Sequence, residues 1–431
     1  MMEQGTGLGP ALERLYKRRA FGVKPGLDGI RALCKALDHP EKNFAFIHIA
    51  GTNGKGSVAA LLEAVLRQCG LHPGLYTSPH LVRFNERIRL DGKDATDEML
   101  AASLEVCEEA SAAVQASSHY ECTFFEIATA MAFVCMREAG TRLAVVETGL
   151  GGRLDATNVV QPLVTVITRI GMDHEAYLGT TLAAVAYEKA GIIKPGCPVV
   201  SAPQEPEAEA VLRKVAEDQQ APLTFAPDMV TIEQVGKSCE SGQNVRLSSE
   251  RGLSGKLLLP LHGVHQVENL GVAVAAMELV AEAINMELRI EMLREGLSLV
   301  RWQGRMQYLK SNVLLDAAHN ADAARVLVQS LRKQGWRKVV LVTAMCADKN
   351  TVAVARILSG VAGTVYCCKF SGGRCESPEV LASCYQQNGI DAKIIEDPQA
   401  ALQMAEHDAK DRNLPVVIAG SIFLVGAVLP A

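Results

Sequence analysis

The sequence predicts an α/β fold in two domains, in which buried and mainly parallel strands alternate with helices. Three observations support this class. Apolar runs typical of strands alternate with amphipathic stretches along most of the chain, which is the pattern of a parallel sheet covered by helices. The chain has 431 residues, more than one domain usually contains. The apolar runs at 44–50, 143–147 and 163–170 lack polar alternation, as strands buried on both faces do.

Composition and charge indicate a folded protein whose partners are small molecules. Hydrophobic residues make up 48% of the chain and charged residues 21%, which is far from the profile of a disordered protein. The formal net charge of −5 argues against general affinity for nucleic acid or anionic lipid. The first residues lack the apolar core of a signal peptide, and no apolar run reaches the ~20 residues of a membrane span. We therefore expect a cytoplasmic protein that binds neither nucleic acid nor membrane.

The N-terminal domain is expected to span residues 1–298 and to contain a mainly parallel sheet. Its three predicted strands each end just before a cluster of residues suited to chemistry. Because ligands bind beyond the carboxyl ends of strands in open α/β sheets, the three clusters should converge on one crevice. The pattern weakens between residues 200 and 262, where we expect a small peripheral β region. Helices are predicted again over 265–280 and 290–300.

The C-terminal domain, residues 299–431, is predicted to be a second, Rossmann-like α/β unit. Apolar runs at 312–316, 338–344, 363–369 and 415–420 have the length and composition of strands, and helical stretches lie between them. This part of the chain also has about the modal size of a domain.

The first polar cluster, "GTNGKGS", has the features of a phosphate-binding loop, since it follows a predicted strand and leads into an amphipathic helix. The glycines, here Gly54 and Gly56, let backbone amides approach an anion, and the helix N-terminus adds partial positive charge. Lys55 would then reach the terminal phosphates of ATP, and Ser57 could contact Mg²⁺. The loop is a shortened variant, because Ile49 stands where the common spacing has its first glycine. The alternative is a glycine-rich turn with an exposed lysine.

The other two clusters supply candidate ligands for Mg²⁺. This ion prefers octahedral oxygen coordination and usually binds one or two carboxylates, so Ser57 alone does not suffice. Glu147 ends the second strand directly before "TGLGGRLDATN" and is the best carboxylate candidate. His174, in "GMDHEAYLG", is an unusual ligand for Mg²⁺, and from the residues alone an ordinary polar role in a loop explains it equally well.

Six segments of the chain resemble the folylpolyglutamate synthase family, which includes bifunctional bacterial enzymes with dihydrofolate synthase activity and belongs to the Mur ligase superfamily. They read "GTNGKGS", "ETGLGGRLDATN", "MDHEAYLGTTLAAVAYEKAGIIKPG", "HQVEN", "WQGRMQ" and "LDAAHN". The resemblance implies a P-loop ATPase domain followed by a ligase domain. It also implies an ATP-dependent ligase that adds L-glutamate to folates and to dihydropteroate. In that reaction ATP converts a carboxylate to an acyl phosphate, which the amino group of glutamate attacks.

The resemblance further implies which residues serve ATP and Mg²⁺. The ATP-binding residues are Gly54, Lys55, Gly56, Ser57, Asn269, Arg305 and Asp316, and the ligands of Mg²⁺ are Ser57, Ser78, Glu147 and His174. Lys55, His174 and Lys189 would be catalytic, and Lys189 matches a lysine that is carbamylated in the superfamily. The alternative for Lys189 is a plain cation at the end of a helix that Thr181 could cap and Gly191 could end. Residues from both domains would thus form one interdomain active site.

The substrate site is implied in the same way by three short segments. They comprise Lys24, Pro25 and Gly26, then Thr123, Phe124, Phe125 and Glu126, then Leu154, Asp155 and Ala156. The paired phenylalanines could present an aromatic face to a flat pterin ring. Adjacent side chains cannot both face one ligand, however, so core packing is favoured for one of them. His319 and Asn320 resemble positions near the glutamate site, and Arg374 is a candidate partner for a carboxylate.

Three alternatives stay open. The enzyme is either bifunctional or a folylpolyglutamate synthase alone, because both reactions use the same chemistry. A Mur-type ligase of cell-wall synthesis shares the loop, but it usually carries a further domain before the loop, for which the position of Lys55 leaves little room. An ATP-binding module without ligase activity would not need Glu147, His174 and the nucleotide contacts of the second domain together. Since one chain supplies the whole site, we expect a monomer.

Overall fold

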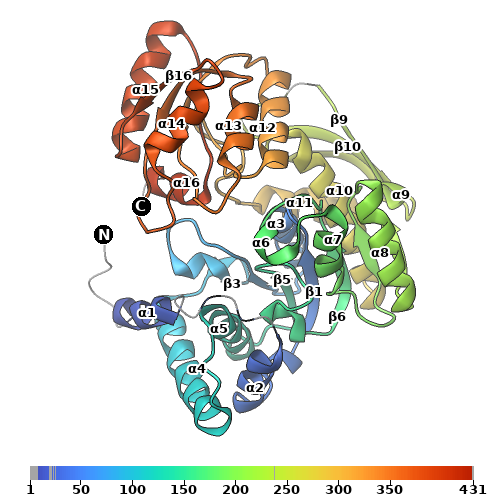
Figure 1. Ribbon diagram of the computed structural model, residues 1–431. Helices are drawn as coiled ribbons and strands as arrows, with labels where there is room; N and C mark the ends of the chain where they lie inside the picture. The colour runs from blue at the N-terminus through green and yellow to red at the C-terminus, as the bar shows by residue number, and fades with distance from the viewer. Residues whose placement is uncertain (1–7, 19–21, 23, 25, 237, 430–431) are drawn as a thin grey trace.

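The computed structural model describes residues 8–18, 22, 24, 26–236 and 238–429 and shows two α/β domains, each built on a large sheet (Figure 1). This confirms the predicted fold class. The predicted limit at 298/299 falls at the end of helix α11 (Ile290–Leu299), and as a domain boundary it stays a prediction. None of the helices within the described residues is long and apolar enough to cross a membrane.

The first sheet has eight strands in the order β4-β3-β2-β5-β1-β6-β7-β8. They are β1 (Ala45–Ala50), β2 (Gly74–Tyr76), β3 (Ile88–Leu90), β4 (Lys93–Asp94), β5 (Leu143–Glu147), β6 (Pro162–Ile167), β7 (Val199–Ser201) and β8 (Leu223–Phe225). The strands from β2 through β5, β1, β6 and β7 to β8 pair in parallel, and β3 and β4 extend one edge as antiparallel strands. The predicted strands at 44–50 and 143–147 are confirmed as β1 and β5.

The third predicted strand, at 163–170, ends at Ile167. The chain beyond it leaves the sheet because its backbone supports the neighbouring loop. The carbonyl of Arg169 accepts hydrogen bonds from the amides of Thr52 and Asn53, at 2.9 and 3.2 Å. The apolar run therefore continues past the strand into a segment that holds the predicted phosphate-binding loop.

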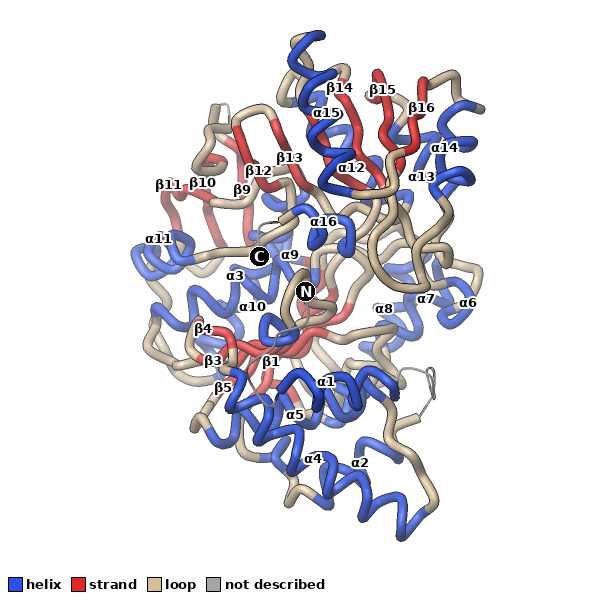
Figure 2. The backbone as a smooth tube through the Cα atoms, turned by 90° about the vertical axis from the view of Figure 1, so that its left-hand side faces the viewer, coloured by secondary structure: helices blue, strands red, loops and turns tan. Residues whose placement is uncertain are grey.

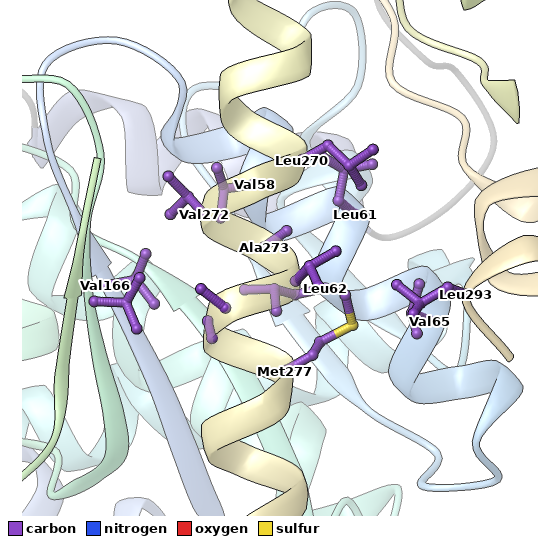
Figure 3. Packing of buried hydrophobic residues seen from close by; sticks show 14 of the residues in the cluster. Val58, Leu61, Leu62, Val65, Val166, Leu270, Val272, Ala273, Met277 and Leu293 are labelled. Atoms are coloured by element: carbon purple, nitrogen blue, oxygen red, sulfur yellow. The ribbon is translucent and has the colours of Figure 1, made fainter. Parts of the chain in front are cut away.

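Helices cover both faces of the first sheet. One face carries α3 (Lys55–Gln68), α10 (Val264–Ala283) and α11, and the other carries α1 (Leu8–Lys17), α2 (Asp28–Ala36), α4 (Asp97–Ser118) and α5 (Phe124–Glu138). Strand β1 shows the reason, because Ile47 packs with α3 whereas Phe46 packs with α5. Figure 3 shows Leu61 of α3 beside Leu270 of α10 and Leu62 beside Met277. The helices predicted over 265–280 and 290–300 are confirmed as α10 and α11.

The region between 200 and 262 contains the predicted peripheral β structure. A three-stranded antiparallel sheet is formed by β9 (Val230–Gln234), β10 (Gln243–Ser249) and β11 (Ser254–Leu259). The prediction missed helix α8 (Pro206–Asp218) and the short helix α9 (Ala226–Met229) in this region, and the strand-like residues of β8 join the large sheet and not the peripheral one. Helix α7 (Leu182–Ala190) packs against α8, and the short helix α6 (Glu175–Leu178) precedes it.

The second domain has a six-stranded sheet in the order β12-β13-β17-β14-β15-β16. Its strands are β12 (Gln307–Lys310), β13 (Val313–Leu315), β14 (Val339–Thr343), β15 (Ala362–Cys367), β16 (Asp391–Ile394) and β17 (Val416–Ala419). Its helices are α12 (Ala321–Lys333), α13 (Thr351–Leu358), α14 (Pro378–Gln386), α15 (Pro398–Arg412) and α16 (Ile422–Val428). The four predicted strands are confirmed. The prediction missed only the edge strands β12 and β16, which are short and largely polar.

The two domains meet where the loops of their sheets face each other. In both Figure 1 and Figure 2 the second domain lies at one end of the molecule, and helices α1, α2 and α4 lie at the opposite end. The carboxyl ends of β1 and β6 lead into loops that form hydrogen bonds with the second domain, and Glu147 at the end of β5 lies beside the first of these loops. The three polar clusters found in the sequence therefore lie at the interdomain face.

Candidate active site

The loop between β1 and α3 folds tightly around the side chain of Lys55. The Lys55 ammonium donates hydrogen bonds to the carbonyls of Gly51 and Thr52, at 3.1 and 3.3 Å. Gly54 has φ = +96°, and a Cβ atom there would lie 2.5 Å from Oδ1 of Asn269. Both the backbone angle and the close approach require glycine at this position. The loop thus places a lysine and the N-terminus of α3 together, as an anion-binding loop does.

Glu147 supplies a buried carboxylate beside this lysine. The register of β1 and β5 pairs Glu147 with Ile49, and its Oε1 lies 3.9 Å from Nζ of Lys55. Its Oε2 accepts a hydrogen bond of 3.4 Å from the amide of Ser78. Burial raises the pKa of the Glu147 carboxyl, and the charges of Lys55 and Arg305 oppose that rise. Two predicted residues, Glu147 and Ser78, are therefore brought together at the start of α3.

These residues fit part of a site for Mg²⁺. A Cβ atom on Gly56 would lie 3.4 Å from Oε2 of Glu147, so the carboxylate faces the first turn of α3, where Ser57 lies. A carboxylate and two serine hydroxyls are the hard oxygen ligands that Mg²⁺ prefers. Among the residues that the structure describes, no three His, Cys, Asp or Glu side chains converge to hold a metal ion. Protein ligands of this kind would have to share the ion with oxygens of a bound phosphate or of water.

His174 lies in a network that joins the two domains. Its Nε2 is 3.1 Å from Nζ of Lys349, and burial lowers the pKa of its imidazole to about 4, so the ring is neutral and can accept a hydrogen bond. Lys349, in the loop after β14, also donates to the carboxylate of Asp173 at 2.6 Å. The sequence analysis missed both Asp173 and Lys349. Asp173 directly precedes His174 in the motif, which was the one available signal.

Two predicted residues of the second domain also reach the network. Nε2 of His319 lies 3.3 Å from Oδ2 of Asp173. The amide of Asn320 donates to Asp173 at 3.2 Å and to Oδ1 of Asn53, in the loop before Lys55, at 3.1 Å. The start of α12 thus contacts the phosphate-binding loop directly.

Asp316 and Arg305 also belong to the interdomain site. The carboxylate of Asp316 accepts hydrogen bonds from the amides of Met306 and Ala318, at 3.0 and 2.8 Å, and its burial raises the pKa of the carboxyl. The positive charge of Arg305 opposes the rise at both Asp316 and Glu147. Arg305 therefore lies within electrostatic reach of a carboxylate in each domain.

Asn269 and Gln266 connect α10 to the loop. Asn269 donates to Oε1 of Gln266 at 2.9 Å, and Gln266 donates to the hydroxyl of Ser57 at 3.2 Å. The structure thus brings the predicted residue Asn269 to the loop. The sequence analysis missed Gln266, although it lies in the "HQVEN" motif.

Lys189 ends α7 with its side chain directed inward. Thr181 caps the helix by accepting from the amide of Ala184, and Gly191 follows its last residue, as predicted. Nζ of Lys189 donates to the carbonyl of Gly51 at 2.8 Å, which is the carbonyl that Lys55 also contacts. Burial, followed by repulsion from Lys55, lowers the pKa of the Lys189 amine to about 7. Lys189 thus lies at the end of the helix, but its side chain is buried beside the phosphate-binding loop.

The residues assigned to the pteroate site form a separate region around the start of α5. Thr123 and Glu126 form a capping box, in which Oε2 of Glu126 accepts from the amide of Thr123 at 2.7 Å. Lys24 donates to the carbonyl of Glu121 at 2.9 Å. Gly26 is partly buried, and Pro25 lies outside the described residues. The substrate role of these residues stays a prediction.

The two phenylalanines of this region point in different directions. The ring of Phe124 stacks on Tyr16, with centroids 5.7 Å apart and planes 20° apart. Phe125 packs against the glycine-rich loop after β5, since a Cβ atom on Gly149 would lie 2.4 Å from its Cζ. Both rings are partly buried, and each already has a packing partner.

Asp155 organises the glycine-rich loop with both carboxylate oxygens. Oδ2 accepts from the amides of Gly149 and Leu150, at 2.9 and 2.8 Å, and Oδ1 accepts from the amide and hydroxyl of Thr157, at 3.0 and 2.6 Å. Leu154 on one side is partly exposed, and Ala156 on the other is buried. The side chain of Asp155 thus shapes the loop, and ligand contact in this segment stays a prediction.

Arg374 lies at the edge of the second domain. Its guanidinium pairs with Asp348 at 3.4 Å, and the side chain is 62% exposed. Asp348 directly precedes Lys349 in the chain, so Arg374 lies near that lysine. The role of Arg374 as a partner for a substrate carboxylate stays a prediction.

Trp302, which the sequence analysis missed, covers the start of α3. A Cβ atom on Gly56 would lie 2.6 Å from Cζ2 of Trp302, so the ring is in contact with the loop glycine. The guanidinium of Arg89, in strand β3 of the first domain, lies 5.7 Å from the centroid of the Trp302 ring. Nε1 of Trp302 has no hydrogen-bond partner within the described part of the chain. The segment between the domains therefore packs directly on the loop.

Replacing Gly56 by alanine should push Trp302 off the loop. Forcing a methyl group into such a contact costs about 1–3 kcal/mol, so the free energy of unfolding should fall by about that much. The intrinsic fluorescence should also shift, because Trp302 and Trp336 are the only tryptophans. Chemical denaturation followed by fluorescence measures both. The control is Gly271→Ala in α10, where a Cβ atom meets only Cδ1 of Ile232 at 3.9 Å, and unchanged stability and fluorescence in Gly56→Ala would contradict the contact.

Comparison with known proteins gives the family of this chain. Residues 90–277 match the Mur ligase middle domain, and residues 304–422 match the Mur ligase glutamate ligase domain. A dihydrofolate synthase/folylpolyglutamate synthase of Bacillus subtilis is 34% identical over 419 residues, which cover 96% of each chain. The chain belongs to the Mur ligase family, among the folylpolyglutamate and dihydrofolate synthases. The resemblance seen in the sequence is thereby confirmed.

Two further members of this synthase family show how far the similarity extends. A folylpolyglutamate synthase of Lacticaseibacillus casei is 33% identical over 93% of this chain and 92% of its own. The solved structure of Mycobacterium tuberculosis folylpolyglutamate synthase complexed with ADP superposes with a TM-score of 0.90, at 31% identity and 97% coverage of each chain. This chain therefore has the same fold as a synthase whose structure was solved with ADP bound.

Proposed function

We propose that the protein is an ATP-dependent ligase that joins L-glutamate to folates and to dihydropteroate through an acyl phosphate. The observation that carries the proposal is the pairing of Lys55 with Glu147, 3.9 Å apart, in a phosphate-binding loop that second-domain side chains contact. A passive nucleotide-binding module has no need of this second contact surface. The names of the B. subtilis and L. casei relatives support the choice of substrates.

The chemistry requires a carboxylate to become a good acyl donor. A carboxylate oxygen of the acceptor attacks the γ-phosphorus of ATP, and the bond from that phosphorus to the β-γ bridging oxygen breaks, which releases ADP. The amino group of glutamate then attacks the acyl carbon, the amine loses a proton, and inorganic phosphate leaves with one oxygen of the original carboxylate. Lys55 and the N-terminus of α3 stabilise the charge on the transferring phosphoryl group.

Some of the predicted residues bind the nucleotide, and others bind Mg²⁺. Gly54, Gly56 and Ser57 bind the phosphates with Lys55, Arg305 donates to phosphate oxygens, and Asp316 and Asn269 bind the remainder of ATP. Ser57, Ser78, Glu147 and His174 would hold Mg²⁺, which would supply positive charge to the phosphates of ATP. His174 can ligate through Nε2 only if Lys349 gives up its 3.1 Å contact with that atom.

Lys189 is proposed to be carbamylated. Its neutral amine adds to the carbon of CO₂ and releases a proton, which turns a cation beside Lys55 into an anion. A pKa of about 7 leaves a large part of the amine neutral at physiological pH, as this addition needs. An anion there would also relieve the repulsion from Lys55.

Lys189→Ala should lower activity about 100-fold, because it removes a charge next to the transferring phosphoryl group. Added bicarbonate or a short-chain carboxylic acid should restore part of the activity by occupying the space of the carbamate. The assay is ADP formation with increasing acid. Lys194→Ala is the matched control, since Lys194 lies in the same segment and donates to the carbonyl of Asn158 at 3.0 Å. Full activity in Lys189→Ala, or an equal response of the control to acid, would refute the role.

The acceptor is proposed to lie between the second domain and the region around α5. Lys24, Gly26, the 123–126 segment and the 154–156 segment would line the pteroate end, and His319 would lie near glutamate. Retention of the segments that contain Lys24 and Phe124 favours the bifunctional enzyme over a folylpolyglutamate synthase alone. A cytoplasmic location and a monomeric state belong to the same proposal.

The proposed function is tested by measuring ADP formation with ATP, Mg²⁺ and L-glutamate. Three parallel reactions contain dihydropteroate, tetrahydrofolate or no acceptor, and mass spectrometry follows the products. Turnover with both acceptors and a gain of one glutamyl unit would support the bifunctional enzyme. Turnover with tetrahydrofolate alone would reduce it to a folylpolyglutamate synthase, and no turnover with either would mean a different carboxylate substrate.

A further inference from the structure

We infer that Asp173 is a positioning residue, which holds Lys349 and His319 of the second domain beside the phosphate-binding loop. Asp173 lies in the first domain, between β6 and α6. The contacts themselves do not depend on the proposed function. Their effect on catalysis rests on the proposed function.

Three side chains of the second domain meet at this one carboxylate. Lys349 donates to Oδ1 at 2.6 Å, Asn320 donates to Oδ2 at 3.2 Å, and Nε2 of His319 lies 3.3 Å from Oδ2. These residues come from two separate loops, one after β14 and one before α12. One carboxylate of the first domain therefore fixes two loops of the second.

The Asp173–Lys349 pair is buried on both sides. The side chains are 9% and 8% exposed, respectively. A buried ion pair of this kind adds little net stability, because desolvation offsets most of the attraction, but it favours one geometry strongly. The ammonium of Lys349 also lies 3.1 Å from Nε2 of His174. The arrangement thus specifies how the domains fit together more than how firmly each is folded.

The same network connects to the loop that holds Lys55. Asn320 contacts Asn53, which lies in that loop, as well as Asp173. When Asp173 binds Lys349, the ammonium is therefore delivered close to the site where anionic reactants bind. If the domains separate, Lys349 leaves with the second domain and the site loses this cation.

Hydrogen exchange measured by mass spectrometry tests the contact without using activity. In Asp173→Asn and in Lys349→Met, backbone amides in 171–178 and in 345–351 should exchange roughly tenfold faster, while the core strands β1 and β14 keep their protection. Asparagine keeps an oxygen for the local hydrogen bond from the amide of His174, so loss of folding is not expected. The control is Lys333→Met, because Lys333 also bonds across the domains, to Gln234, but on an exposed surface.

Kinetics then separate positioning from simple support. Each of the two variants should lower kcat about 100-fold with little change in the KM for ATP, because misplacing a group by an ångström costs about that much. The double variant should be no slower than Asp173→Asn alone, since that variant already removes the ion pair that Lys349→Met removes. Lys333→Met should change neither exchange nor kcat.

The outcomes distinguish this inference from the proposed function. Unchanged exchange at both loops, or additive losses of kcat in the double variant, would overturn the positioning role even in an active ligase. If the unmodified protein showed no folate-dependent ADP formation, the proposed function would fail, and faster exchange in both variants would still support the interdomain contact.

Discussion

Lys55→Ala is expected to abolish ligation while leaving the protein folded. Within the described residues, the Lys55 ammonium has polar contacts with the loop carbonyls of Gly51 and Thr52 and with the nearby carboxylate of Glu147, so it is available to an anion at the start of α3. Removing a preorganised positive group from a transferring phosphoryl group costs about 1,000-fold in kcat. The free energy of unfolding should change by no more than about 1 kcal/mol, because the side chain stabilises no part of the core.

ADP formation and chemical denaturation, measured on the same preparation, separate the two effects. Lys42→Ala is a suitable control, since Lys42 is an exposed lysine of the same domain that precedes β1. Loss of folding in Lys55→Ala with normal activity per folded molecule would show that the lysine serves the structure and not a ligand.

Glu147→Gln should cause the second large loss of activity. The substitution keeps the size of the side chain but removes the negative charge beside Lys55 and Ser57. We expect kcat to fall about 100-fold and the Mg²⁺ concentration needed for half-maximal activity to rise about tenfold, since a carboxylate is the main charged ligand available to the ion. Titration of activity with Mg²⁺ measures both quantities.

The same substitution should not destabilise the protein. Because burial raises the pKa of Glu147, the ionised carboxylate opposes folding at neutral pH, and that cost is absent below the ordinary carboxyl pKa, where both states are protonated. Glu147→Gln should therefore raise the free energy of unfolding by about 1 kcal/mol at pH 7 and by less near pH 4. A loss of stability at pH 7 would contradict this account of the site.

Glu63→Gln provides the matched control for both effects. Glu63 is a glutamate of α3 that is 3% exposed, and burial raises the pKa of its carboxyl as well. It pairs with Arg67 one turn further along the helix, and no hydrogen bond or ion pair joins it to the phosphate-binding loop within the described part of the chain. Glu63→Gln should keep normal activity and normal dependence on Mg²⁺.

The sequence could predict those parts of the site that depend on local patterns. The run at 44–50, the glycines around Lys55 and the helix after them form one continuous strand–loop–helix unit, and its geometry follows from neighbouring residues. Glu147 was predictable for a similar reason, because it ends an apolar run that leaves little doubt about the strand. Thr181 and Gly191 likewise limit α7 through local capping.

The sequence could not predict contacts between the domains. Lys349 lies 176 positions from Asp173 in the chain, and no local pattern indicates that the loop after β14 reaches the loop after β6. The position of Trp302 on Gly56 has the same origin, since it depends on how the segment between the domains crosses α3. The edge strands β12 and β16 were missed because partly exposed strands lack the continuous apolar run of central ones.

The acyl phosphate is the central claim, and transfer of ¹⁸O tests it most directly. The acceptor that turns over is labelled with ¹⁸O in its reacting carboxylate and incubated with ATP, Mg²⁺ and L-glutamate. Mass spectrometry of the released phosphate should show one ¹⁸O atom for each amide bond formed, because the carboxylate oxygen that attacks ATP leaves with phosphate. Formation of the amide with unlabelled phosphate would contradict the account.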